Sequence, residues 1–176
     1  MRGVIFTELY ELIEEKFGYE ILDDIIVASN LPHEGAYSAT GNYPFVELLS
    51  LVNELHKQSK LPIETLLELF GEQLFAKLIS MHPQFDLSME FLDFLENVEL
   101  YIHNEVQKLY PDAELPKFDI LSKSKNTFIF YYNSSKRLHY LAKGLIVGAS
   151  KHFKTNVSVI MTPQKDGRVL FEISLI

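Results

Sequence analysis

Apolar residues recur every three or four positions through the first two-thirds of the chain, which is the spacing of amphipathic helices. In residues 3–18, Ile5, Leu9 and Leu12 form such a stripe, and Gly18 is placed to end the helix. A later segment rich in Gly, Ser and Asn predicts a loop. The pattern therefore predicts helices over residues 3–18, 19–29, 43–60, 62–83 and 87–110.

The period of the pattern changes after Pro116. Residues 118–121 and 126–133 predict strands, whereas residues 134–153 return to helical spacing. The closing segment alternates on both sides of a Lys-Asp-Gly turn, which is typical of a β-hairpin. We therefore expect an α+β fold, with a helical N-terminal lobe packed on a C-terminal lobe of antiparallel sheet plus helix.

Composition narrows the class of protein. The chain has 176 residues, of which 47% are hydrophobic, enough to bury a substantial core as one domain. A formal net charge of -8 argues against nucleic acid as a partner. No leader sequence opens the chain and no apolar run reaches the roughly 18 residues of a membrane helix, so we expect a cytoplasmic protein without a membrane partner. Because the chain has no cysteine, a bound metal must rest on His, Asp or Glu.

Motifs of common enzyme chemistry are missing, and we predict no catalytic residue. The six histidines include no H-x-x-x-H pair, and there is no G-x-S-x-G, Walker or G-x-G-x-x-G pattern. Gly144 and Gly148 are spaced to allow close packing of a helix. His103 lies beside the apolar stripe of the predicted 87–110 helix. There it either satisfies a local hydrogen bond or serves as the single axial ligand that haem iron needs, and its position alone leaves both alternatives open.

A second candidate group follows the strand predicted before residue 134. If this strand stays extended to about Lys136, then Tyr132, Ser134 and Lys136 project to one side and offer a phenol, a hydroxyl and an ammonium to a carboxylate. The alternative is that Ser134 or Ser135 caps the next helix. Spacing alone does not decide between them.

Six segments share an order and spacing that is informative as a set. They are "MRGVIF", "GEQLF", "HNEV", "LYPDAELP", "YNSSKRL" and "GLIVGASKHF". Over essentially the whole chain they resemble the haem-nitric oxide/oxygen binding (H-NOX) family, in its stand-alone bacterial type, which is related to the haem domain of soluble guanylate cyclase. The resemblance implies a single domain over residues 1–176, with haem b (protoporphyrin IX iron) between a distal helical lobe, residues 1–62, and a proximal lobe, residues 63–176.

The resemblance also implies how the site works. His103 would be the proximal ligand of the iron, while Pro116 and Ile5 would press on the porphyrin and distort it. Nitric oxide bound at ferrous iron would weaken or break the bond to His103 and shift a conformational equilibrium. The signal would pass to a separate effector protein, such as a histidine kinase or a cyclic-di-GMP enzyme, so the chain would be a gas sensor for signal transduction and not an enzyme.

The family binds the haem propionates with a Tyr-x-Ser-x-Arg motif. Here the motif stands as Tyr132, Ser134 and Lys136, with lysine where arginine is usual. Arginine can grip a carboxylate with two parallel hydrogen bonds, whereas lysine offers a compact point charge. We expect haem to bind less rigidly as a result, with Arg137 assisting.

The distal side of the haem would be apolar. Oxygen-binding members place a tyrosine in the helix after the propionate motif, and here that position is Leu141, with Tyr140 one residue away. The other expected lining residues are Leu9, Leu74, Leu78 and Leu145. Bound oxygen gains from a hydrogen-bond donor, whereas nitric oxide binds ferrous haem strongly without one. The expected ligand is nitric oxide, with carbon monoxide as a weaker mimic and no stable oxygen binding.

Two rival functions remain. The first is a helical protein-interaction or small apolar-ligand-binding module without haem, in which His103 is a satisfied core residue. The second is an oxygen carrier or haem enzyme, against which the lack of a donor at Leu74 and Leu141 argues. The colour and gas spectra of the reduced protein distinguish all three.

Overall fold

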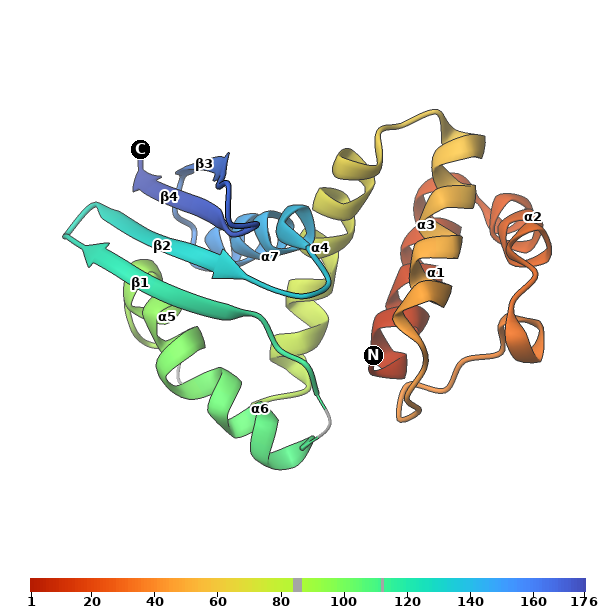
Figure 1. The fold of residues 1–176 in the computed structure, drawn as a ribbon, viewed down its shortest axis with the longest axis horizontal. Helices are drawn as coiled ribbons and strands as arrows, with labels where there is room; N and C mark the ends of the chain where they lie inside the picture. The colour runs from red at the N-terminus through yellow and green to blue at the C-terminus, as the bar shows by residue number, and fades with distance from the viewer. Residues whose placement is uncertain (84–86, 112) are drawn as a thin grey trace.

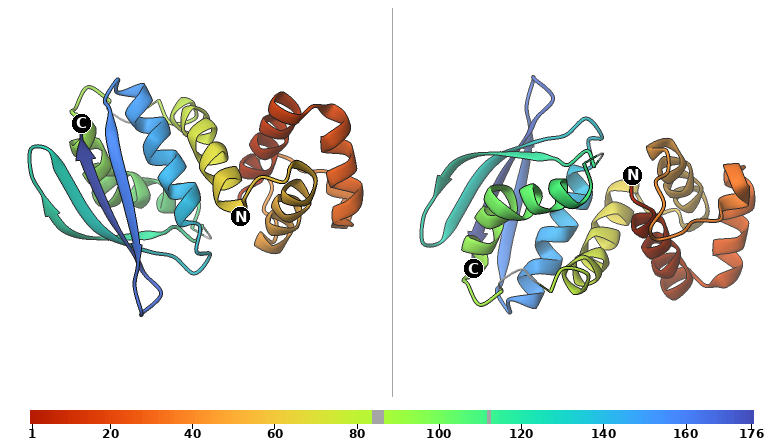
Figure 2. Two further views of the ribbon diagram at one scale, coloured as in Figure 1. Left: turned by 90° about the horizontal axis from the view of Figure 1, so that it is seen from above. Right: turned by 90° about the horizontal axis from the view of Figure 1, so that it is seen from below.

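The computed structural model describes residues 1–83, 87–111 and 113–176. Its elements are α1 (Gly3–Phe17), α2 (Tyr19–Ser29), η1 (Pro32–Gly35), α3 (Phe45–Ser59), α4 (Ile63–Ser80), α5 (Phe91–Asn97), η2 (Val98–Ile102), α6 (His103–Leu109), β1 (Lys117–Lys123), β2 (Thr127–Asn133), α7 (His139–His152), β3 (Val157–Pro163) and β4 (Val169–Leu175). Helices α1 to α3 lie on one side of α4, and the sheet with α5, α6 and α7 lies on the other (Figures 1 and 2). The predicted α+β architecture is confirmed.

The first four predicted helices form close to their expected bounds. Gly18 ends α1 with a φ of 94°, a left-handed value that costs glycine little because it has no Cβ. Pro44 and Pro62 stand immediately before α3 and α4, in extended conformations. The segment rich in Gly, Ser and Asn that was predicted as a loop covers residues 33–44. The short 3-10 turn η1 overlaps its first residues.

The fifth helix differs from its prediction in two ways. It begins at Phe91 and not at residue 87, because Glu90 is extended, with φ -70° and ψ 153°. It is also not a uniform α-helix, since Val98–Ile102 form a π-helical turn between α5 and α6. Such turns widen the helix by one residue per turn and are frequent at functional sites. This one ends directly before His103.

The sheet has four antiparallel strands in the order β1-β2-β4-β3. Side chains on one face of its two central strands are buried and pack with residues of α5 and α7 in one apolar cluster. The Lys-Asp-Gly turn joins β3 to β4 as predicted, and Gly167 there has a φ of 87°. The register pairs Phe118 of β1 with Tyr132 of β2.

Helices α4 and α7 cross at glycines. A Cβ atom on Gly144 would lie 2.1 Å from the carbonyl oxygen of Glu68, and one on Gly71 would lie 2.2 Å from that of Leu141. Gly148 is packed similarly, 2.6 Å from the carbonyl oxygen of Glu72. The predicted close packing at Gly144 and Gly148 is confirmed, and Gly71 completes the contact from α4.

Candidate functional site

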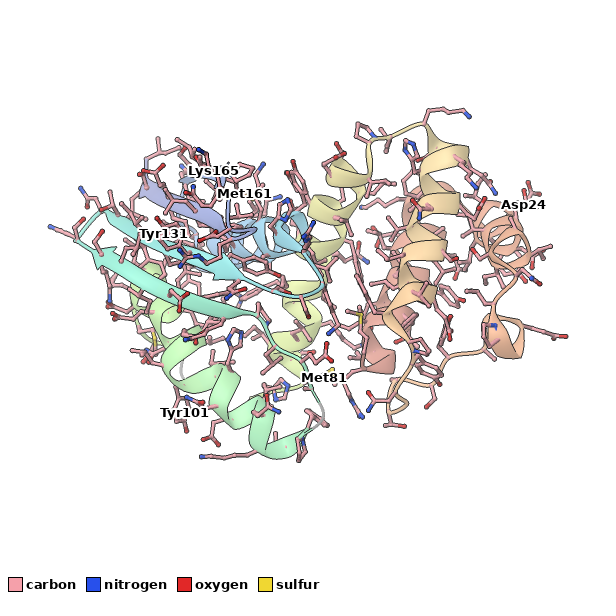
Figure 3. The ribbon with its side chains drawn as sticks, viewed as in Figure 1. Asp24, Met81, Tyr101, Tyr131, Met161 and Lys165 are labelled. Carbon is pink, nitrogen blue, oxygen red and sulfur yellow. The ribbon has the colours of Figure 1, made fainter. Side chains whose placement is uncertain are left out.

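His103 begins α6, directly after the π-helical turn, and its side chain is 18% exposed. Its Nδ1 lies 3.0 Å from Oε2 of Glu99, one turn earlier. A carboxylate can only accept, so Nδ1 carries the proton and donates it, which leaves Nε2 with the lone pair. No described residue hydrogen-bonds that Nε2. By contrast, Tyr101 of the preceding π-helical turn faces outward and is 53% exposed (Figure 3).

Burial sets the charge of the imidazole. It lowers the pKa of His103 below its ordinary value, and the Glu99 carboxylate opposes this effect without reversing it. His103 is therefore neutral at neutral pH, which is the form of histidine that binds metals. A largely buried, neutral and oriented imidazole is chemically suited to be an axial ligand.

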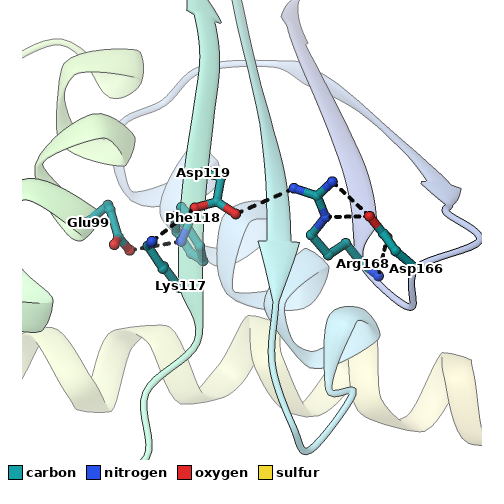
Figure 4. A network of polar contacts seen from close by, with 6 residues as sticks. All are labelled: Glu99, Lys117, Phe118, Asp119, Asp166 and Arg168. Atoms are coloured by element: carbon teal, nitrogen blue, oxygen red, sulfur yellow. Dashed lines mark hydrogen bonds and ion pairs between the residues drawn. The ribbon is translucent and has the colours of Figure 1, made fainter.

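Phe118 joins this group to the strand that follows Pro116. Its backbone N–H donates to the same Oε2 of Glu99 at 3.0 Å (Figure 4). Its ring meets the His103 ring edge to face, with centroids 5.2 Å apart. The helix carrying His103 and the segment containing Pro116 are thus linked through one carboxylate oxygen and one aromatic ring.

The three predicted propionate residues do not form one extended row. Strand β2 ends at Asn133, because the chain turns: the hydroxyl of Ser134 accepts from the N–H of Lys136 at 3.3 Å, and Arg137 has a φ of 52°. The extended strand to Lys136 was therefore wrong. The serine cap was wrong too, since α7 begins at His139 without a side-chain cap.

Each of the three residues nevertheless has a defined environment. Tyr132 is buried at 4% exposure; burial raises the pKa of its phenol, which the Ser134 hydroxyl opposes as a hydrogen-bond partner. The ammonium of Lys136 is paired with the carboxylate of Glu114, although only 14% of the lysine side chain is exposed against 72% for Glu114. Lys136 is thus a sheltered cation that binds a carboxylate.

The N-terminus reaches the same region. The guanidinium of Arg2 lies over the ring of Tyr110, 4.4 Å from its centroid. The amino group of Met1 donates to the carbonyl oxygen of Tyr43 at 2.7 Å, and its pKa is lowered first by burial and then by the charge of Lys136. The segments "MRGVIF", "LYPDAELP" and "YNSSKRL" therefore meet in space, although Asp112 lies outside the described residues.

The residues predicted for the distal side gather in a single apolar cluster. Leu9 and Leu74 are 1% exposed and Leu141 is 8% exposed. Ile5, Leu78 and Leu145 are partly buried and pack against the same cluster, which Tyr140 also touches at its edge.

The tyrosines nearby already have partners. The hydroxyl of Tyr10 donates to the carbonyl oxygen of Gly35 at 2.9 Å, and that of Tyr37 donates to Glu47 at 2.6 Å. The hydroxyl of Tyr43 accepts from the N–H of Ser38 at 2.8 Å. These tyrosines pack against the same cluster, but their hydroxyls are engaged in protein hydrogen bonds.

Residues 2–161 match the protein family described as Haem-NO-binding. The chain belongs to this H-NOX family. The cofactor of the family is haem, and its members are sensor domains and not catalysts.

Solved H-NOX structures agree with this assignment over the full chain. The ferrous unliganded protein from K. algicida is 36% identical, with a TM-score of 0.94 over 100% of this chain and 97% of that one. The carbon monoxide complex from Shewanella woodyi is 39% identical, with a TM-score of 0.84 over 99% and 94% of the two chains. The nitric oxide complex from S. oneidensis is 26% identical, with a TM-score of 0.89 over 100% and 99%. A comparison with curated proteins found no match.

Neither a cluster of metal-binding side chains nor a membrane-spanning helix occurs in the described part of this H-NOX chain. Within residues 1–83, 87–111 and 113–176, no three His, Asp or Glu side chains lie together as a metal site. In the same described part of the chain, no helix is long and apolar enough to cross a bilayer.

Sequence reasoning missed three residues of this H-NOX site: Glu99, Phe118 and Glu114. The spacing of Glu99, four residues before His103 on one helix, could have indicated it. The contacts of Phe118 and Glu114 join segments that are distant in sequence, and no local pattern predicts them.

Proposed function

We propose that this H-NOX domain senses nitric oxide at ferrous haem, with His103 as the axial ligand, and passes the signal to a separate effector protein. The observation that carries the proposal is the His103 imidazole, which is neutral and holds Nδ1 against Glu99, so that Nε2 presents a lone pair. When bound, haem would supply ferrous iron that binds a diatomic gas.

The donors around Tyr132 fit the two propionates of haem. The phenol of Tyr132 is protonated at neutral pH, as an ordinary tyrosine is, and can donate a hydrogen bond. Lys136 already binds a carboxylate, that of Glu114, which stands in for the chemistry of a propionate. Because Glu114 is largely exposed, its ion pair contributes little stability, and a propionate could displace it from Lys136. We propose that Tyr132, Ser134 and Lys136 hold the propionates, and that Pro116 and Ile5 press on the ring.

The apolar cluster supports nitric oxide as the ligand. Leu9, Leu74 and Leu141 bring no donor to a bound gas, and we propose that they form the distal wall with Leu78 and Leu145. Such a wall disfavours oxygen, which gains from a donor, far more than nitric oxide or carbon monoxide.

The proposed output of the sensor is a change in the relative position of its two lobes. We propose that residues 1–62 and 63–176 would shift relative to one another if the bond between His103 and a haem iron were weakened or broken. Helix α4 packs against both α1 and α7, so such a shift would change the contacts that α4 makes. The effector would read this change of shape, as a histidine kinase or a cyclic-di-GMP enzyme could.

Absorption spectra of the reduced protein test the proposal directly. We expect a Soret band in the parent, a shift of that band with nitric oxide or carbon monoxide, and no stable complex in air. His103→Ala should lose haem, and added imidazole should restore it by filling the vacated position. His56→Ala is the matched control, because His56 is exposed and its Nδ1 lies 2.6 Å from the carbonyl oxygen of Leu61.

Each outcome bears on a different part of the proposal. A parent protein that stays colourless after reconstitution with haem would favour the haem-free interaction module. Haem retained by His103→Ala without imidazole would remove the ligand role of His103. A stable oxygen complex in air would contradict the apolar distal wall.

A further inference from the structure

One oxygen atom of Glu99 accepts two hydrogen bonds. Its Oε2 takes the Nδ1 proton of His103 and the backbone N–H of Phe118, each at 3.0 Å. The Glu99 side chain is 20% exposed, so water screens these contacts only partly. A single charged acceptor therefore orients the imidazole and attaches it to the start of β1.

We propose that Glu99 is a positioning residue that strengthens the bond between His103 and iron and couples that bond to β1. The inference rests on the proposed function, since it assumes that His103 is the axial ligand. A carboxylate that accepts from the outer nitrogen of a ligating histidine fixes the tautomer and makes the inner nitrogen more basic. A more basic Nε2 donates more strongly to iron.

The local backbone explains why Glu99 can reach both donors. Glu99 is the second residue of the π-helical turn, and His103 directly follows the last one. Their side chains lie on the same side of the helix. Phe118 sits at the second position of β1, and its ring packs on His103. Movement of the imidazole must therefore stretch or turn a contact that β1 shares.

The coupling reaches into the sheet beyond Phe118. Lys117 and Asp119 on either side of it are paired at 3.2 Å, and Asp119 lies 3.6 Å from Arg168 on the β3–β4 hairpin (Figure 4). Arg168 is in turn paired with Asp166 at 2.7 Å. The start of β1 is thus held on one side by Glu99 and on the other by the hairpin.

Glu99→Gln removes the negative charge of the carboxylate and keeps the shape of the side chain. The amide oxygen of glutamine can take the place of Oε2 and accept both hydrogen bonds, but it is neutral. Glu99→Ala removes both bonds. Glu105→Gln is the matched control: Glu105 lies on α6, and its carboxylate pairs with the largely exposed Lys108 at 2.7 Å.

The primary measurement is the iron–histidine stretching frequency of the ferrous unliganded holoprotein, by resonance Raman spectroscopy. We expect Glu99→Gln to lower this frequency, Glu99→Ala to lower it further, and Glu105→Gln to leave it unchanged. With nitric oxide, the fraction of five-coordinate haem should rise in the order parent, Gln, Ala. Haem dissociation should be about tenfold faster in Glu99→Ala, the scale seen when an outer partner of a metal ligand is removed.

The outcomes separate this inference from the proposed function. If the parent shows an iron–histidine band and Glu99→Gln keeps the same frequency and the same five-coordinate fraction, the role of Glu99 is refuted while His103 remains the ligand. If the parent shows no iron–histidine band, the proposed function fails, and the role of Glu99 falls with it. Should Glu99→Ala not fold, Glu99→Gln still decides, because it preserves both hydrogen bonds.

Discussion

Replacing Gly144 by alanine places a methyl group where α4 and α7 cross. The new Cβ would lie 2.1 Å from the carbonyl oxygen of Glu68 and 2.9 Å from the Cα of Gly71. The first distance falls about 1.3 Å short of the 3.4 Å at which ordinary van der Waals contact begins. Both neighbours are backbone atoms, so no side-chain rotation relieves the clash and the helices must move apart.

The cost can be worked from two opposing effects. Overpacking of a tight interior contact typically costs 1–3 kcal/mol, and a rigid backbone neighbour favours the upper end of about 3 kcal/mol. Alanine recovers about 1 kcal/mol over glycine through its higher helix propensity. The expected net loss is about 2 kcal/mol in the free energy of unfolding. For a chain of this length that corresponds to a fall of about 4–8 °C in Tm.

Thermal and denaturant unfolding, followed by circular dichroism, measure this loss. Gly167→Ala is the control, since Gly167 has a φ of 87° and no atom within 4 Å of its new Cβ. It should cost about 1 kcal/mol, through backbone conformation alone. A Gly144→Ala protein as stable as the parent would refute the close approach of α4 and α7.

Three further predictions concern the haem region and the N-terminal helices. Lys136→Arg should slow the transfer of haem to an excess of a haem-accepting protein, because a guanidinium grips two carboxylate oxygens; Lys136→Ala retaining haem as well as the parent would contradict the role of Lys136. Leu141→Tyr should bring a donor into the apolar cluster and slow oxygen dissociation, measured by stopped-flow absorption; an unchanged rate would mean that Leu141 does not line the distal wall. Burial, reinforced by the Glu47 charge, raises the pKa of Tyr10 from 10.0 to about 12, so the folded protein holds this proton more tightly than the unfolded chain. The resulting stability is full below pH 10 and is lost as pH rises towards 12, so denaturant unfolding at a series of pH values should show a shallower alkaline decline in Tyr10→Phe.

Much of the fold could be predicted because its signals are local. The apolar spacing of α1, the glycine that follows it and the turn before Gly167 each depend on a few neighbouring residues. The same holds for the close packing at Gly144, since only a missing side chain permits it. Resemblance to the H-NOX family then selected His103 from among the six histidines of the chain.

Other features depended on contacts that no local pattern contains. The helix predicted over residues 134–153 begins only at His139, because the chain first turns after Asn133, where the hydroxyl of Ser134 accepts from the N–H of Lys136. The helix predicted from residue 87 starts at Phe91, where Glu90 leaves the helical conformation. In both cases the hydrophobic period predicted the type of element correctly and its first residue incorrectly.

The sequence by itself determined the α+β class, the order of the helices and strands, and the residues available for chemistry. Only the tertiary structure decided what those residues touch. Glu99 accepts from Phe118, 19 positions away, and Lys136 pairs with Glu114, 22 positions away. Periodicity encodes which face of an element is buried, whereas the tautomer of His103 depends on a carboxylate held in place by a strand. That strand, β1, is in turn positioned by its pairing with β2.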